Sequence, residues 1–179
     1  MKVAYADPPY IGCAHLYPEH EEVDHEKLID RLVNEFPDGW ALSCHSPSLQ
    51  YLLSLCPSDV RILAWVKPFA VFKPNVGLAY AWEPVILRDG RKRTRQQPTV
   101  RDWVAVNITM KKGLVGAKPA KFAYWLFDAM NLQPGDEFVD LFPGTGIMTQ
   151  CWNEYSARSV PSQLNFLREL PEPISSQGA

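Results

Sequence analysis

Short apolar segments that alternate with amphipathic helical segments constrain this chain more than any other feature of its sequence. Residues 3–6, 40–44 and 60–66 read as buried strands, and helical patterns follow Asp24 and Ser46. Strands that alternate with helices are typical of α/β proteins with a mostly parallel sheet. We therefore expect an α/β fold with helices on both faces of the sheet.

Two of the expected helices begin with recognisable signals. Asp24 is expected to cap the first helix, with Val23 and Leu28 in the flanking staple positions. Ser46 is expected to cap the second, because Pro47 follows it at the first helical position. Apolar residues then repeat at helical spacing in both segments, so each helix should bury one face.

The second half of the chain continues the alternation. Residues 78–87 and 103–108 are strand candidates, and Glu83-Pro84 should interrupt the first, because proline cannot donate to a strand ladder. A helix is expected from Pro119 to about Met130, a strand over 137–141 and a last helix ending near Tyr155.

Composition places the chain among globular proteins. It has 179 residues, 46% of them apolar, and a net charge of −2, which fits one domain. No apolar run approaches the roughly 18 residues of a membrane span, and the N-terminus lacks a secretion signal. Four scattered cysteines without a CxxC pair fit reduced thiols, so we expect a cytoplasmic protein of a bacterial or phage-infected cell without membrane contact.

The sequence Asp7-Pro8-Pro9-Tyr10 directly follows the first strand. Ligands of α/β sheets bind beyond the carboxyl ends of strands. A carboxylate there can accept hydrogen bonds from an amine, the prolines stiffen the loop and free its carbonyls, and the tyrosine ring can stack on a base. An ordinary strand-ending turn is the alternative reading.

The run from Asp140 to Gly146 (DLFPGTG) joins the expected strand over 137–141 to the last helix. A strand, a glycine turn and a helix form the usual cradle for a nucleoside cofactor, because glycines admit the ligand and helix N–H groups face it. The run is not GxGxxG, and a tight strand–helix turn is the alternative reading.

A basic cluster stands out in a slightly acidic chain. It comprises Arg88, Arg91, Lys92, Arg93 and Arg95. Such a cluster could neutralise phosphates, although a solvated loop is the alternative. His20 and His25 lie near acidic residues, but their spacing matches no helical HExxH pattern, so we expect a solvated loop and no metal.

Together the two motifs resemble the amino-group DNA methyltransferases, which use S-adenosylmethionine (SAM). The catalytic motif precedes the cofactor loop here, as in the circularly permuted group, whose order also resembles the MT-A70-like adenine methyltransferases. Lys118-Pro119, Pro134-Gly135-Asp136 and the cofactor strand are similar to the run that precedes the cofactor loop in this group. The resemblance covers about residues 1–155 and implies a Rossmann-like SAM-dependent methyltransferase fold.

The resemblance assigns a role to each motif residue. Asp7 and the Pro8 carbonyl would accept hydrogen bonds from the amine of a flipped base, on which Tyr10 would stack, with Pro9 completing the catalytic motif. Asp140 would hold the methionine amine of SAM and Lys118 its carboxylate. The remaining cofactor-binding residues would be Asp7, Phe142, Gly144, Thr145 and Gly146.

The resemblance also sets domain limits and alternatives. It implies one domain over 1–165 with a basic insert at about 88–102 and a tail over 166–179. A strand is expected over 156–160, but Pro161-Ser162-Gln163 stands where the family carries its ribose-binding acid.

The expected activity is N6-adenine methylation of DNA. The alternatives are N4-cytosine methylation, RNA adenine methylation, and a catalytically impaired subunit that binds nucleic acid. A homodimer or a partner subunit fits any of these activities.

Overall fold

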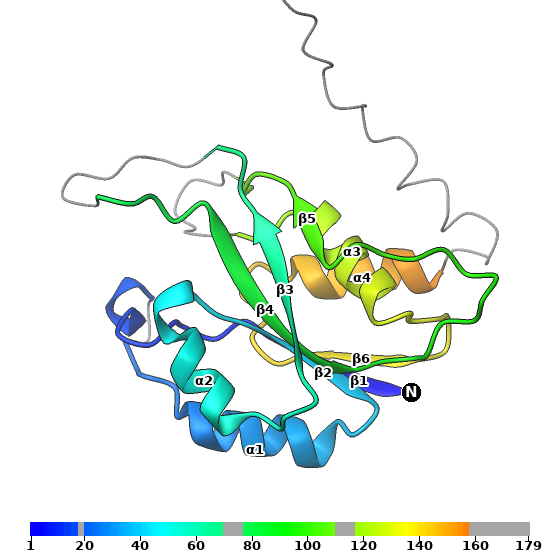
Figure 1. The fold of residues 1–179 in the computed structure, drawn as a ribbon, viewed down its shortest axis with the longest axis horizontal. Helices are drawn as coiled ribbons and strands as arrows, with labels where there is room; N and C mark the ends of the chain where they lie inside the picture. Colours follow the sequence, from blue (N-terminus) through cyan, green and yellow to red (C-terminus); the bar gives the residue numbers. More distant parts are fainter. Residues whose placement is uncertain (18–19, 70–76, 110–116, 158–179) are drawn as a thin grey trace, which may run out of the picture.

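A computed structural model describes residues 1–17, 20–69, 77–109 and 117–157, and its centre is a six-stranded sheet (Figure 1). The strand order is β5-β3-β4-β2-β1-β6. The strands are β1 (Lys2–Ala6), β2 (Gly39–Ser43), β3 (Arg61–Val66), β4 (Trp82–Asp89), β5 (Trp103–Ala105) and β6 (Glu137–Asp140). The helices are α1 (His25–Glu35), α2 (Leu49–Leu55), α3 (Ala120–Ala129) and α4 (Ile147–Ser156), with 3₁₀ turns η1 (Ala14–Leu16) and η2 (Ser46–Ser48).

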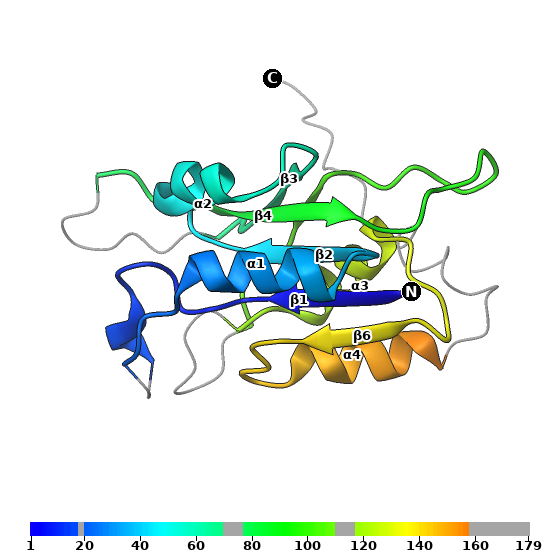
Figure 2. The same cartoon turned by 90° about the horizontal axis from the view of Figure 1, so that it is seen from below.

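All described strands except β4 run in one direction. Strand β1 is parallel to β2 and β6, and β3 is parallel to β5, whereas β4 is antiparallel to both of its neighbours. Figure 2 shows β1, β2 and β6 pointing one way and β4 the other. The expected mostly parallel sheet is confirmed. As a consequence, the carboxyl ends of the parallel strands and the start of β4 meet at one edge, which we call the carboxyl edge.

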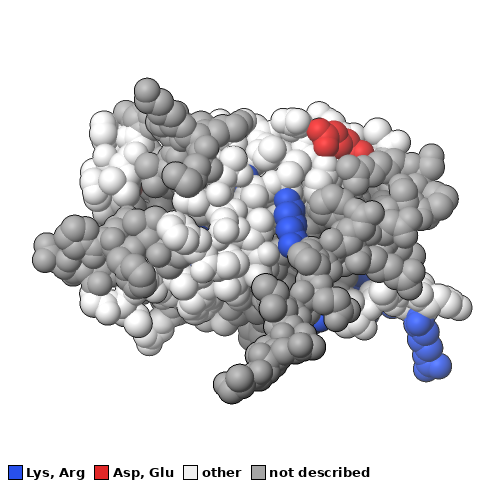
Figure 3. Space-filling model, turned by 90° about the horizontal axis from the view of Figure 1, so that it is seen from above, with Lys and Arg blue, Asp and Glu red and all other residues white. Residues whose placement is uncertain are grey.

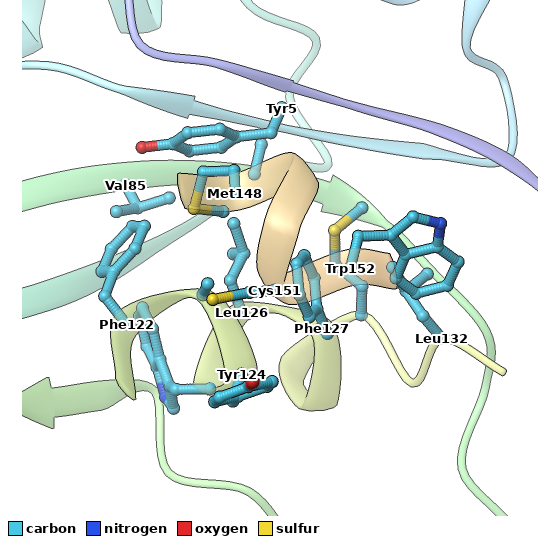
Figure 4. Close-up of a cluster of buried hydrophobic side chains, with 14 of the residues drawn as sticks. Tyr5, Val85, Phe122, Tyr124, Leu126, Phe127, Leu132, Met148, Cys151 and Trp152 are labelled. Carbon is cyan, nitrogen blue, oxygen red and sulfur yellow. The ribbon is translucent and has the colours of Figure 1, made fainter. Parts of the chain in front are cut away.

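Helices cover both faces of the sheet, as expected (Figure 1). Helices α1 and α2 pack on one face over Trp40, Leu42 and Ile86. Helices α3 and α4 pack on the other face, where Phe122, Phe127 and Trp152 meet the sheet residues Tyr5 and Val85 (Figure 4). Each face of the sheet therefore has its own apolar cluster.

The two helix starts behave differently. Asp24 caps α1 as expected, since its side chain accepts a hydrogen bond from the Lys27 N–H. The expected cap at Ser46 is wrong: Ser46 is the first residue of η2, whose cap His45 makes no side-chain capping bond. Helix α2 begins only at Leu49, because the chain first makes a tighter turn through Pro47.

Pro84 does not interrupt its strand, contrary to the expectation. Strand β4 runs unbroken through it and pairs Pro84 with Ala64 of β3. The Ala64 N–H points away, to the Asp102 carbonyl, while the Pro84 carbonyl accepts from Cys44 just past the end of β2. The N–H that proline lacks is therefore not needed by a ladder at this position.

Three expected limits need correction, and the others are close to those observed. Strand β4 covers Trp82–Asp89 rather than residues 78–87. Strand β5 ends at Ala105 rather than at residue 108. Helix α4 includes Ser156, so no strand begins there, and residues 158–165 of the expected domain and the tail over 166–179 lie outside the described residues. All four cysteines are free thiols, and no helix in the described ranges is long and apolar enough to cross a bilayer.

Candidate active site

Asp7 lies at the carboxyl edge because β1 delivers it there. Four buried residues, 3–6, anchor the strand between β2 and β6, and Asp7 follows at its end with its side chain 24% exposed. Pro8 is buried, and no N–H of the described residues donates to its carbonyl. A carboxylate and a free carbonyl are thus fixed side by side on a stiff backbone.

Lys118 contacts Asp7 across 111 residues of sequence. Its ammonium nitrogen lies 2.8 Å from both Oδ1 and Oδ2 of Asp7, and its side chain is only 5% exposed. The ammonium also lies 5.1 Å from the ring centre of Trp65 and 5.9 Å from that of Phe122. A buried cation among aromatic rings needs paired anions, and Asp7 is one of them.

Glu83, near the start of β4, is the second anion. Its Oε2 lies 3.5 Å from the Lys118 ammonium and accepts a 2.7 Å hydrogen bond from the Tyr10 hydroxyl. Its Oε1 pairs with Lys67 at 2.7 Å, and both of these side chains are about 15% exposed. Two carboxylates and two ammonium groups therefore balance in a mostly buried cluster that joins β1, β3, β4 and the start of α3.

Burial and charge oppose each other in this cluster. Burial raises the pKa of Asp7, and the Lys118 ammonium counteracts that rise. Burial acts against the charge of Glu83 too, yet Lys118 and Lys67 hold its pKa below the usual value. Burial disfavours the charged form of Lys118, yet the carboxylates of Asp7 and Glu83 keep the pKa of Lys118 raised. Lys118 is therefore a fixed cation.

The Tyr10 ring has two neighbours in the site. It stacks on His45, with ring centres 5.3 Å apart and planes 10° from parallel, and the Lys118 ammonium lies 6.0 Å from its centre. His45 is held in turn by Ser48, whose hydroxyl lies 2.8 Å from Nδ1. A cavity of about 610 Å³ opens beside this stack, with His45, Ile11 and Tyr51 in its lining. An aromatic stack beside an open cavity is suited to a flat ligand.

Asp140 ends β6 next to β1, paired with Tyr5 two residues before Asp7. Its Oδ1 accepts a 3.3 Å hydrogen bond from the Phe142 N–H, whereas Oδ2 is buried and has no partner among the described residues. Burial raises the pKa of Asp140 to about 6, with the charge of Asp7 adding to the effect. A buried acceptor without a partner marks a place where a ligand donor would fit.

The glycine turn after β6 leads into α4. Gly144 and Gly146 have positive φ angles of 47° and 73°, and Gly146 is the N-cap of α4. A side chain added at Gly146 would meet nothing within 4 Å, so the space above the helix start is open. Thr145 is exposed and Phe142 packs partly against the α1/α2 cluster.

The structure brings together the expected residues of both motifs but not the basic cluster. That cluster begins at the end of β4, which runs in reverse, so it lies at the opposite edge of the sheet (Figure 2). Three of its arginines have internal partners: Arg88 contacts Asp59 at 3.1 Å, Arg91 contacts Asp136 at 2.6 Å, and Arg93 donates to the Pro98 and Asp128 carbonyls. Only Lys92 and Arg95 of the cluster are exposed.

A basic groove lies at this opposite edge. Its volume is about 370 Å³, and Arg93 and Arg95 line it together with Arg61 and Arg101. Asp102 also lies in the lining, 3.5 Å from Arg61. In the view of Figure 3, the described Lys and Arg side chains appear as separate spots.

Sequence patterns missed three contributors to the site. Glu83 lies in a segment that was expected to be interrupted, and the sequence patterns assigned no site role to Lys67 or His45. The expected histidine loop is also corrected, since His25 is 6% exposed and begins α1, with Nδ1 2.8 Å from the Val23 carbonyl. Among the described residues no group of three metal-ligating side chains occurs.

Solved structures share this fold at low sequence identity. The complex of M1.HpyAVI with SAM has a TM-score of 0.59 and 14% identity over 87% of this chain and 78% of that one. Another structure of M1.HpyAVI has a TM-score of 0.57 and 12% identity over 87% and 76%. A protein assigned as a DNA modification methylase of Thermus thermophilus has a TM-score of 0.51 and 19% identity over 97% and 89%.

The chain therefore shares the α/β fold of these methyltransferase structures, and the expected α/β class with helices on both faces of the sheet is confirmed. No family model and no curated protein matches the sequence.

Proposed function

We propose that this protein is a SAM-dependent methyltransferase that modifies the exocyclic N6 amine of adenine in DNA. The observation that carries the proposal is the pair of carboxylates at the carboxyl edge. Asp7 follows β1, and Asp140 ends the neighbouring strand β6. Oδ2 of Asp140 has no described partner, and each Asp7 oxygen accepts from Lys118 but has a further lone pair for an amine. SAM brings one amine and an adenine base brings the other. The shared fold of the SAM complex of M1.HpyAVI supports this assignment.

The residues after β6 fit the cofactor. The unpartnered Oδ2 of Asp140 would accept from the methionine amine, and the open turn at Gly144 to Gly146 would admit the nucleoside against the start of α4. Phe142 and Thr145 would shape the pocket, and bound SAM supplies an electrophilic methyl group. Lys118 remains a candidate for its carboxylate, but its ammonium already bridges Asp7 and Glu83.

The motif after β1 fits the target amine. Asp7 and the Pro8 carbonyl would each accept one N–H, which directs the nitrogen lone pair away from them and toward the methyl group. Pro9 keeps the loop stiff, and Tyr10 would stack on the flipped base on the ring face opposite His45 or after His45 moves aside. Positioning and hydrogen bonding carry much of such a transfer.

We assign phosphate contact to the opposite edge. Lys92 and Arg95 are the exposed members of the basic cluster, and Arg95 shares a groove with three more arginines. Cations grouped in a groove attract the nucleic-acid backbone. Arg88, Arg91 and Arg93 would contribute less, because internal partners already engage them.

The test is incubation with methyl-labelled SAM and unmethylated DNA or RNA, followed by digestion and identification of the nucleosides. We expect label in N6-methyl-2′-deoxyadenosine from DNA. Label in N4-methyl-2′-deoxycytidine from DNA, or in N6-methyladenosine from RNA, would replace the substrate assignment. No label anywhere, with a folded protein that binds nucleic acid, would favour the non-catalytic subunit and overturn the proposal.

A further inference from the structure

We propose that Glu83 is a positioning residue of the active site, which sets both the charge of Asp7 and the orientation of Tyr10. This inference rests on the proposed function and adds a residue to it. Glu83 contacts Lys118, Lys67 and the Tyr10 hydroxyl, at 3.5, 2.7 and 2.7 Å respectively. It is 14% exposed, at the start of β4 on the carboxyl edge.

Glu83 weakens the attraction between the Lys118 ammonium and the Asp7 carboxylate. The ammonium is close to both Asp7 oxygens, and a lysine paired with Asp7 alone would compete with an incoming amine for the same lone pairs. Because the ammonium also faces Glu83, its charge is divided between two carboxylates. Lys67 balances Glu83 in turn, so the cluster stays neutral without weakening Asp7 as an acceptor.

Glu83 also fixes the Tyr10 ring. The hydroxyl hydrogen bond holds one end of the side chain, and the His45 stack holds one face. A ring held at both places has little rotational freedom, and therefore presents a defined surface at the mouth of the site. One carboxylate thus connects the amine acceptor to the aromatic platform.

The experiment compares Glu83→Gln, which keeps the shape of the side chain and an acceptor for Tyr10 but removes the charge, with the wild type. We expect kcat to fall about tenfold to a hundredfold, while KM for SAM changes less than about threefold. Glu137→Gln, at the exposed far end of β6, is the matched control and should leave both constants unchanged.

The second readout is the titration of Asp7, followed through its side-chain carboxyl carbon by NMR. The negative charge of Glu83 raises the pKa of Asp7, so Glu83→Gln should lower it and move the acid limb of the kcat profile to lower pH. A structural defect alone would not shift this limb in that direction. The other titratable groups coupled to Asp7 are Lys118, Asp140, Tyr5, Tyr10, Tyr17 and Cys44.

An unchanged kcat or an unchanged Asp7 titration in folded Glu83→Gln would overturn the inference. If that variant does not fold, Lys67→Met with Glu83→Gln keeps the cluster neutral and is judged by the same titration. Absence of methyl transfer by the wild type would overturn the proposed function instead, and the Asp7 titration would still decide whether Glu83 controls that carboxyl group.

Discussion

Charged side chains lie at both the carboxyl edge and the opposite edge of the sheet, but the two groups differ in whether they have hydrogen-bonding partners. At the carboxyl edge, Asp140 keeps a buried oxygen without a described partner, and the Pro8 carbonyl next to the paired Asp7 accepts from no described N–H. At the opposite edge, Arg88 and Arg91 are paired with Asp59 and Asp136. Unmet hydrogen-bonding capacity in a buried place indicates a ligand site, whereas satisfied charge indicates a structural role.

The largest expected effect in this comparison is on Asp7. Asp7→Ala should reduce methyl transfer about 10²- to 10³-fold, because it removes an acceptor whose hydrogen bond strengthens in the transition state. Labelled methyl transfer under single-turnover conditions measures the loss. Asp7→Asn, which keeps an oxygen acceptor, should lose less. Wild-type turnover by a folded Asp7→Ala protein would refute the catalytic assignment.

We expect Asp140 to strengthen cofactor binding at the cost of the stability of the free protein. Asp140→Asn removes a charge-assisted hydrogen bond of roughly 1.5–3 kcal/mol, which should weaken SAM binding about tenfold to a hundredfold by calorimetry. Equal affinities of the variant and the wild type would show that Asp140 does not hold the amine.

The same variant should stabilise the free protein. Because the folded-state pKa of Asp140 is raised to about 6, the wild type loses stability as pH rises from about 4 to above 6. After a discount for partial exposure, Asp140→Asn should gain about 1–2 kcal/mol at pH 8 and nothing below pH 4. Denaturant unfolding at both pH values measures this, and an equal difference at both would contradict the burial argument.

At the opposite edge, Arg91 should affect stability rather than chemistry. Arg91→Gln breaks the contact with the Asp136 carboxylate, which is 5% exposed, and should cost about 1–3 kcal/mol of unfolding free energy. Lys92→Gln, next to it and exposed, is the matched control and should cost less than about 0.5 kcal/mol. Equal losses of unfolding free energy in the two variants, measured by urea denaturation, would show that Arg91 is no more structural than Lys92.

The smallest expected effect concerns the exposed cations. Lys92→Gln with Arg95→Gln should weaken nucleic-acid binding and flatten its salt dependence, by roughly 0.9 in the log–log slope for each lost phosphate contact on duplex DNA. Fluorescence anisotropy over a range of salt concentrations gives this slope. An unchanged slope would mean that these side chains are merely solvated.

The sequence predicted what depends on local patterns. The alternation of strands and helices, the Asp24 cap and the positions of Asp7 and Asp140 at strand ends all follow from neighbouring residues. The contact of Lys118 with Asp7 spans 111 residues, and no local pattern reports it. Glu83 was missed because the proline after it suggested a broken strand, and only the pairing of β4 with β3 and β2 shows why that proline is tolerated.

The basic cluster illustrates a further limit of sequence patterns. Five cations within eight residues predicted a nucleic-acid surface, since composition reports charge but not its partners. The acidic partners Asp59 and Asp136 lie far away in sequence, as does the Asp128 carbonyl that Arg93 reaches. The direction of β4, which places the cluster opposite Asp7, also depends on long-range pairing.

The most direct test of the central claim is a map of backbone amide shifts on titration with S-adenosylhomocysteine, the cofactor without its transferable methyl group. The account predicts that amides from Asp140 to Gly146, and those beside Asp7, shift while amides over 88–95 stay in place. Shifts concentrated at 88–95, or no shift at the carboxyl edge at saturating ligand, would contradict it.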